Sequence, residues 1–241
     1  MNTVRFEHGQ ALVIAHRGLS GIETENTLCA FVAAGNRSYF GIETDVHRTA
    51  DGHFIVIHDD STARVAGLEQ AMAVEETDLE TLRRVTLLGR GGERDRVDLH
   101  LPTLREYVRC CKVYEKVCVL ELKSRFSEEE LARLVGQIRK EDYLHRVIFI
   151  SFHLENLIAL RRMLSDLPLQ LLTKELSADV LQTLLRERLD VDVHWKALDR
   201  EWVERLHEVG ICINTWTVDD PTVGARLAAW GVDQITSNIL E

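Results

Sequence analysis

Residues 117–151 read VCVLELKSRFSEEELARLVGQIRKEDYLHRVIFIS, and this stretch decides the fold class. Residues 117–122 and 147–151 are short apolar runs, which are typical of strands buried on both faces. Between them, residues 127–140 show helical periodicity, with a serine that can cap the helix and glutamates in the first turn. A strand, a helix and a second strand in this order indicate one unit of a parallel sheet.

The same alternation recurs along the whole chain. Further apolar runs that we interpret as strands cover residues 11–15, 41–46, 169–173, 190–194, 211–216 and 234–236. Further helices are predicted over residues 26–34, 104–111, 154–164, 177–188, 199–209 and 221–230. Eight strand–helix units in 241 residues predict an α/β fold, a (β/α)8 TIM barrel forming a single domain over residues 1–241. An open doubly wound sheet is the alternative.

The composition limits the class of partner. The chain has a formal net charge of −10, with 39 acidic and 29 basic residues. This balance disfavours a general nucleic-acid or anionic-membrane binder, because such proteins carry a basic surface. The five cysteines form no CxxC pair, and no apolar stretch is long enough for a secretory signal or a membrane span. We expect a cytoplasmic protein without stable membrane insertion or a nucleic-acid partner, and the oligomeric state stays open.

A hairpin interrupts the alternation. Residues 41–60 contain two apolar runs with no helix between them, and the Asp-Gly pair at positions 51–52 is a strong signal for a two-residue turn. That turn would place Asp45 opposite His58. Because side chains alternate between the two faces of a strand, Glu43 would lie on the same face as Asp45.

Residues 59–100 show no clear strand–helix unit and carry several glycines among many charged residues. We expect a small irregular insertion at this point of the barrel. Two interpretations remain open: a plain excursion over the surface, or a segment that covers a functional site.

Three carboxylates are expected to meet at one end of the barrel. Glu43 and Asp45 alternate on one strand, and Glu121 lies at the end of the strand over residues 117–122. Barrel enzymes carry their function at the carboxyl ends of the strands. Three carboxylates from neighbouring strands would form an oxygen-rich site for Ca²⁺ or Mg²⁺, and zinc is less well matched because no Cys–His cluster has suitable spacing.

Histidine and basic side chains are expected at the same rim. The first strand ends in His16 and Arg17, and Lys123 follows Glu121 two positions later. With His58, the rim would hold two proton-transfer groups, a cation and two basic side chains for an anion. Taken singly, each residue could instead be structural, as a rim ion pair or a buried histidine.

The ordered motifs resemble the glycerophosphodiester phosphodiesterase family. They are HRG at 16–18, ENT at 25–27, IETDV at 42–46, TADG at 49–52, HD at 58–59, LPTL at 101–104, ELK at 121–123, TWTV at 215–218 and GVD at 231–233. Each motif alone is weak, but the ordered set spans about residues 12–238 and is highly specific. Two positions depart from the family pattern: Thr24 stands where a proline is usual, and Ser237 stands where an aspartate usually ends the last strand.

The resemblance implies a TIM barrel with a small insertion after the hairpin, and metal-dependent hydrolysis of glycerophosphodiesters to glycerol 3-phosphate and an alcohol. It implies these roles: His16 and His58 as the acid–base pair, Glu43, Asp45 and Glu121 as ligands of a divalent cation, Ca²⁺ or Mg²⁺, Arg17 and Lys123 as phosphate contacts, and Trp216 in the glycerol pocket. Of the two histidines, we favour His58 as the base. The alternatives are a lysophospholipase D-type enzyme acting on lipid diesters and a non-catalytic metal- or phosphate-binding barrel.

Overall fold

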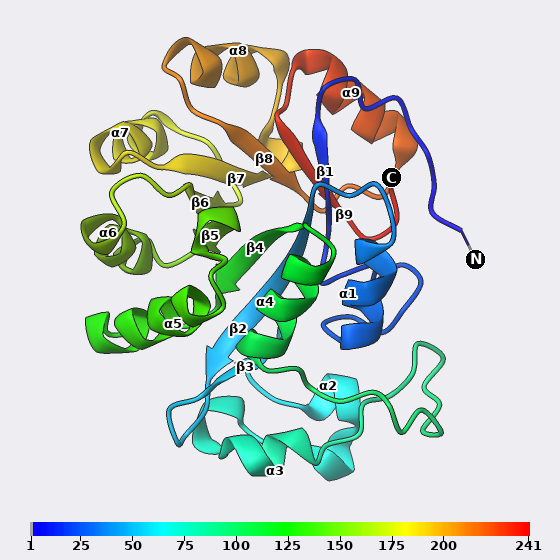
Figure 1. Ribbon diagram of the computed structural model, residues 1–241. Coiled ribbons are helices and arrows are strands. Elements are labelled where there is room, and N and C mark those ends of the chain that lie inside the picture. Colours follow the sequence, from blue (N-terminus) through cyan, green and yellow to red (C-terminus); the bar gives the residue numbers. More distant parts are fainter. Residues whose placement is uncertain (1) are drawn as a thin grey trace.

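A computed structural model describes residues 2–241, and its central feature is a closed barrel of parallel strands (Figure 1). The barrel strands are β1 (Leu12–Ala15), β2 (Gly41–Arg48), β4 (Val117–Leu122), β5 (Val147–Ser151), β6 (Leu169–Thr173), β7 (Asp190–His194), β8 (Ile213–Trp216) and β9 (Gln234–Ser237). The sheet order is β1-β9-β8-β7-β6-β5-β4-β2, and a parallel pairing of β1 with β2 closes the ring. The predicted TIM barrel is therefore confirmed, and the open doubly wound alternative is wrong.

In the described part of the chain, seven major helices surround the strands (Figure 1). They are α1 (Leu28–Gly35), α4 (Leu104–Val113), α5 (Glu128–Lys140), α6 (Leu154–Met163), α7 (Ala178–Glu187), α8 (Arg200–Glu208) and α9 (Pro221–Trp230). No helix follows β9 within the described residues, so the predicted eight strand–helix units are seven units and one bare strand. Beside α9, the side chains of Phe6 and Leu240 approach Gly224 so closely that a Cβ there would lie within 3.1 Å of both. The two ends of the chain thus pack against this last helix.

Local sequence determines where these helices begin. At α5, the Ser127 side chain accepts a hydrogen bond from the backbone of Glu130, whose carboxylate accepts one from the backbone N–H of Ser127. Thr103 and Glu106 form the same reciprocal cap at the start of α4. Each cap satisfies two backbone donors that the helix itself leaves free.

The strands present one face to the helices and one to the barrel interior. In β4, Val117 and Val119 belong to the apolar cluster that fills the barrel, whereas Cys118 and Leu120 belong to the cluster shared with the helices. Strand side chains alternate between the two faces. Glu121 therefore faces the interior at the carboxyl end of β4, which is the end where a barrel carries its site.

The hairpin has a different register from the predicted one. Strand β3 (Phe54–Val56) pairs antiparallel with β2 so that Val46 lies opposite Val56. The loop has three residues between Thr49 and His53, because Gly52 adopts a φ of 78° and accommodates one residue more than a two-residue turn. Asp45 therefore receives a backbone hydrogen bond from Ile57 at 3.1 Å, and the predicted pairing of Asp45 with His58 is wrong by one residue. His58 lies in the loop beyond β3.

The insertion over residues 59–100 forms no named strand in the described chain. It contains the short helices α2 (Ala63–Ala66) and α3 (Leu79–Arg83) and two single-turn 3-10 helices, Leu68–Gln70 and Val74–Glu76. A separate apolar cluster packs the insertion against β3 and against the start of the segment after residue 100. Its members are Ile55, Ile57, Val65, Ala66, Val74, Leu82, Val85, Leu87, Leu99 and Leu101. The insertion lies below the barrel in Figure 1. No helix in the described residues is both long and apolar enough to cross a membrane.

Candidate functional site

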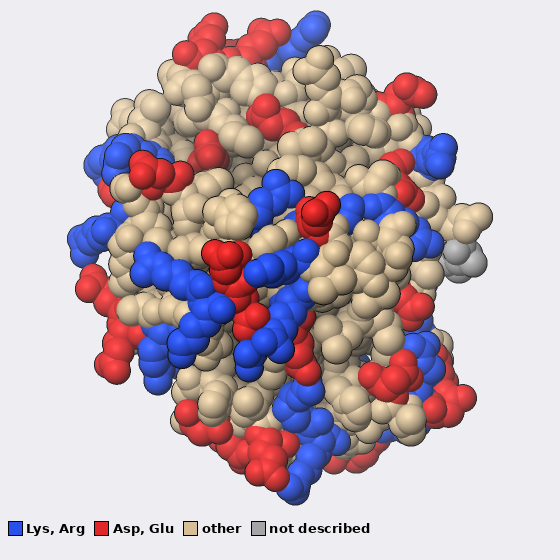
Figure 2. Space-filling model, in the orientation of Figure 1, with Lys and Arg blue, Asp and Glu red and all other residues tan. Residues whose placement is uncertain are grey.

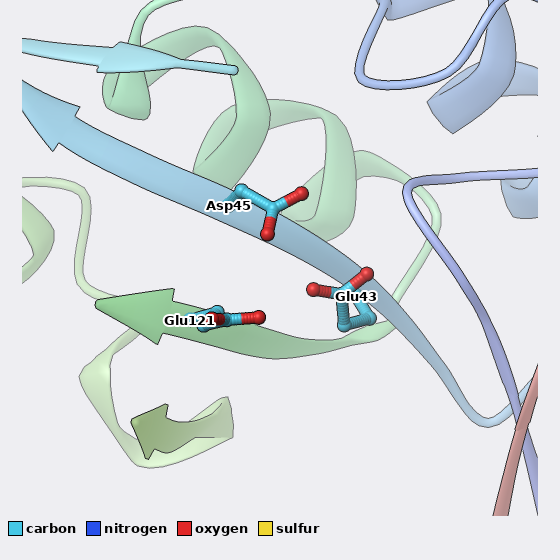
Figure 3. A group of neighbouring side chains, drawn as sticks. All are labelled: Glu43, Asp45 and Glu121. Carbon is cyan, nitrogen blue, oxygen red and sulfur yellow. The ribbon is translucent and has the colours of Figure 1, made fainter. Parts of the chain in front are cut away.

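The three predicted carboxylates converge. Asp45 on β2 lies beside Glu121 on β4 in the strand register, and Glu43 precedes Asp45 on the same face. Each of the three side chains offers an oxygen within 4.8 Å of the others (Figure 3). All three are buried, at 3%, 1% and 8% exposure for Glu43, Asp45 and Glu121. Such a cluster of hard oxygen donors is the ligand set that Ca²⁺ or Mg²⁺ prefers.

The charges of this cluster are only partly balanced. Burial, together with the charges of Asp45 and Glu121, raises the pKa of Glu43 well above its usual value. Burial and the charge of Asp45 raise the pKa of Glu121 to about 7. For Asp45, burial opposes ionisation, but Lys123 and Arg17 outweigh it and lower the pKa. The buried Oδ1 of Asp45 has no hydrogen-bond partner, which leaves it available to a cation.

Two basic side chains flank the carboxylates. The Lys123 ammonium donates to Glu121 at 2.8 Å and lies 3.4 Å from Oδ1 of Asp45. Arg17 contacts Asp45 through Nε at 3.4 Å, and its backbone N–H donates to Glu43 at 2.8 Å. That backbone contact accompanies a left-handed conformation at Arg17, with a φ of 54°. The next residue, Gly18, has to be glycine because a Cβ there would lie 2.7 Å from the backbone of Ala30.

His16 follows β1 and is held through one ring nitrogen. Its Nδ1 lies 2.8 Å from Oδ1 of Asn238, which also accepts from the Ser20 hydroxyl at 2.7 Å. The amide nitrogen of Asn238 donates to Asp219 at 2.6 Å, so the amide oxygen must be the atom that faces His16. An amide oxygen only accepts, so Nδ1 carries the proton and Nε2 of the neutral ring is free to accept one. Burial and the nearby charge of Arg17 lower the pKa of His16 to about 4.

His58 is held in the same way by a different partner. Its Nδ1 lies 2.7 Å from the carboxylate of Asp59. Arg64 on α2 binds Asp59 at 2.6 Å and also donates to Glu25, which in turn accepts from Arg17. Burial is the main cause that lowers the pKa of His58. The insertion therefore contributes a residue, Arg64, that contacts the partners of two site residues.

A cavity of about 110 Å³ opens at the carboxyl ends of the strands. Its walls are His16, Arg17, Glu43, His58, Glu121, Lys123, Ile150, Phe152, Leu172, Asp192, Trp216, Thr217 and Thr236. Seven of the eight residues predicted from the sequence thus surround one space, and the eighth, Asp45, lies behind Arg17 and Lys123. The Trp216 indole donates to the backbone oxygen of Asp192 at 3.1 Å and meets Phe152 edge-on at 5.7 Å between ring centres.

Several site residues escaped sequence reasoning. Asn238, Asp219, Arg64 and Asp192 carry no local motif that distinguishes them, and only Asp59 was visible as the neighbour of His58. At Ser237, where the family usually has an aspartate, another residue supplies a carboxylate. The Ser237 hydroxyl donates to Asp219 at 2.9 Å, so a carboxylate is present near this position but comes from the loop after β8.

Acidic and basic side chains are interspersed over the face shown in Figure 2, which agrees with the mixed charge of the sequence. A sequence model of the glycerophosphoryl diester phosphodiesterase family matches residues 16–240. This chain belongs to that family. The resemblance drawn from the motifs is therefore confirmed.

Individual members of the family are similar over nearly their whole length. A glycerophosphodiester phosphodiesterase of Caldanaerobacter subterraneus is 30% identical over 234 residues, which covers 95% of this chain and 94% of that protein. Among solved structures, a phosphodiesterase of Oleispira antarctica in complex with the product sn-glycerol-3-phosphate superposes with a TM-score of 0.87 at 22% identity, covering 98% of this chain and 96% of that one. A glycerophosphodiester phosphodiesterase of Thermotoga maritima has a TM-score of 0.77 at 26% identity, covering 95% and 94%.

Proposed function

We propose that this chain hydrolyses glycerophosphodiesters to glycerol 3-phosphate and an alcohol with the help of a divalent cation. The observation that carries the proposal is the meeting of three buried carboxylates, two histidines and two basic side chains around one cavity in a barrel of this family. Proton-transfer groups, a cation site and positive charge for a phosphate are the parts that hydrolysis of a phosphodiester requires.

Glu43, Asp45 and Glu121 would hold the cation. Their close approach, their burial and the Oδ1 of Asp45, which accepts no hydrogen bond, fit a hard divalent ion such as Ca²⁺ or Mg²⁺. Such an ion supplies positive charge that stabilises the developing charge on phosphate oxygens. Without such an ion, only the two positive charges of Arg17 and Lys123 balance the three acidic side chains.

The chain's own residues would bind the phosphate and transfer the protons. Arg17 and Lys123 reach the cavity and would bind the non-bridging phosphate oxygens. A base takes a proton from water or from the glycerol 2-hydroxyl as its oxygen attacks phosphorus, and an acid gives a proton to the alkoxide that leaves as the alcohol. With the 2-hydroxyl as nucleophile, water then opens the cyclic phosphate, so both routes end at glycerol 3-phosphate.

The contacts favour one assignment of acid and base. The Asp59 carboxylate beside Nδ1 opposes the lowering of the His58 pKa by burial, and so favours the protonated form that an acid needs. The Asn238 amide beside His16 is neutral, and the pKa of His16 is lowered to about 4. We therefore propose His16 as the base and His58 as the acid, which reverses the preference drawn from the sequence.

Neither alternative function gains support at this site. A lipid diester requires an apolar groove at the barrel mouth, but Arg64 and Asp59 of the insertion form a charged network with Glu25 there. A non-catalytic barrel has no need for two histidines whose Nδ1 atoms are both held and whose rings both border one cavity.

The test is an enzyme-coupled assay of glycerol 3-phosphate release from several glycerophosphodiesters. We expect release that EDTA abolishes and that added Ca²⁺ or Mg²⁺ restores. In the same assay, His16→Ala should lower kcat by about 10²–10⁴-fold, because a positioned proton-transfer group contributes about that much. Absence of release from every diester contradicts the function. Turnover that survives exhaustive removal of metal, checked by elemental analysis, contradicts the role of the carboxylates.

A further inference from the structure

Asp192 is a buried carboxylate that the mechanism above does not use. It lies on β7 between Val191 and Val193, which pack on the side of the helices, so Asp192 faces the barrel interior. It is 2% exposed, and its Oδ1 has no hydrogen-bond partner. It also forms part of the wall of the cavity that holds the two histidines.

Four other polar side chains inside the barrel are hydrogen-bonded to one another. Gln170 donates to Gln234 at 2.9 Å, Asn214 donates to Gln170 at 3.2 Å, and the Thr236 hydroxyl donates to Asn214 at 3.1 Å. A buried carboxylate without such partners lowers the stability of the fold. Burial and the nearby charge of Glu121 accordingly raise the pKa of Asp192 well above its usual value. The fold therefore does not explain this residue, whereas a partner that enters the cavity does.

The charges around the cavity indicate which part of a substrate would contact Asp192. Phosphate oxygens would bind near Arg17 and Lys123, whereas Asp192 has no positive charge to attract them. The wall at Asp192 is shared with the aromatic rings of Trp216 and Phe152. A carboxylate beside aromatic surface suits an organic group that has both C–H surface and a hydrogen-bond donor.

We propose that Asp192 binds a hydroxyl or ammonium donor on the organic part of the substrate and so selects diesters that carry such a donor. This inference rests on the proposed function. The donor has two sources, a hydroxyl of the glycerol shared by all substrates or a donor on the leaving alcohol. Asp192 is a binding residue in either case and makes no covalent bond.

Kinetics on three diesters distinguish the two sources. Glycerophosphoethanolamine and glycerophosphoglycerol carry a donor on the alcohol, whereas the quaternary ammonium of glycerophosphocholine has no N–H. If the donor is on the alcohol, Asp192→Leu lowers kcat/KM at least about tenfold for the first two and spares the third. If it is on glycerol, all three fall together, because a site built for a hydrogen bond discriminates strongly when its partner is lost. Unchanged kcat/KM for all three overturns the inference while leaving the proposed function intact.

Thermal unfolding gives a readout that does not depend on turnover. Asp192→Asn and Asp192→Leu should raise Tm, because each removes a buried carboxylate whose Oδ1 is unpartnered. The matched control is Asp190→Leu on the same strand, outside the cavity wall, which removes the carboxylate that accepts from the backbone of Cys212 at 2.9 Å. That variant should lower Tm and leave the substrate preference unchanged. A lower Tm for both Asp192 variants assigns Asp192 a structural role and contradicts the inference.

Discussion

Both histidines at the cavity have Nδ1 occupied by an oxygen, and the two oxygens differ in charge. The partner of His16 is the neutral amide of Asn238, and the partner of His58 is the carboxylate of Asp59. Either contact orients the ring and holds the proton on Nδ1, which leaves Nε2 as the atom that exchanges a proton. Asn238 is itself oriented by Asp219, so a residue with no motif of its own sets the state of His16.

Replacement of Asn238 tests this orientation. We expect Asn238→Ala to lower kcat by about tenfold or more with little change in KM, because the substrate still binds while His16 samples both tautomers. Nitrogen-15 NMR should show the His16 ring changing from a single Nδ1–H tautomer to a mixture. The double variant Asp219→Asn/Asn238→Asp keeps an oxygen facing His16 and should retain the single tautomer. An unchanged tautomer and kcat in Asn238→Ala would remove Asn238 from the mechanism.

Among the elements, the hairpin and the insertion bring His58 to the barrel. The three-residue loop ends β3 at Val56, so His58 reaches the cavity from a loop and needs support from outside the sheet. Arg64 on α2 provides it by binding Asp59, and the same guanidinium binds Glu25. The insertion therefore contacts the neighbour of His58 and a partner of Arg17, which makes a role in the site a testable expectation.

We expect Arg64→Ala to lower kcat/KM by about tenfold, since it frees Asp59 and Glu25 and thereby loosens His58 and Arg17. Arg84→Ala is the matched control, because Arg84 lies at the end of α3 and forms an exposed ion pair with Glu80. Exposed pairs contribute little stability, so this variant should behave as the wild type. Steady-state kinetics of both proteins provide the measurement, and equal losses in the two variants would contradict a role in the site.

In the whole molecule, the acidic residues lie in two kinds of place, on the surface and inside the barrel mouth. Much of the net charge of −10 belongs to a mixed surface, but Glu43, Asp45 and Glu121 are concentrated inside the barrel mouth. Folding brings these carboxylates out of water and next to one another. The pKa of Glu121 is raised from 4.5 to about 7, so the folded chain binds this proton more tightly than the unfolded chain does. Its stabilising contribution is complete below pH 4.5 and is lost as the pH rises to about 7.

A divalent cation should reverse this loss. In EDTA, Tm should fall between about pH 5 and pH 8 through Glu121, and added Ca²⁺ or Mg²⁺ should raise Tm more at the higher pH, where the carboxylates are charged. Calorimetry at both pH values, with and without the cation, measures the effect. Glu121→Gln should reduce both the pH dependence and the gain from the cation. An equal gain in wild type and variant would place the cation elsewhere.

The barrel could be predicted from the sequence alone, because strand and helix periodicities are local and parallel strands end on the same side of a sheet. The sequence also located eight residues, of which the structure places seven in the cavity wall and Asp45 beside Arg17 and Lys123, since each follows a strand or stands in a local motif. Only the folded structure shows the hairpin register, which depends on the positive φ of Gly52, and shows that no helix follows β9 among residues 2–241. The same holds for the hydrogen-bond partners of the two histidines and for the lack of a hydrogen-bond partner at Oδ1 of Asp192. These depend on barrel closure, which brings Asn238 to His16 across 222 residues, beyond the reach of any local pattern.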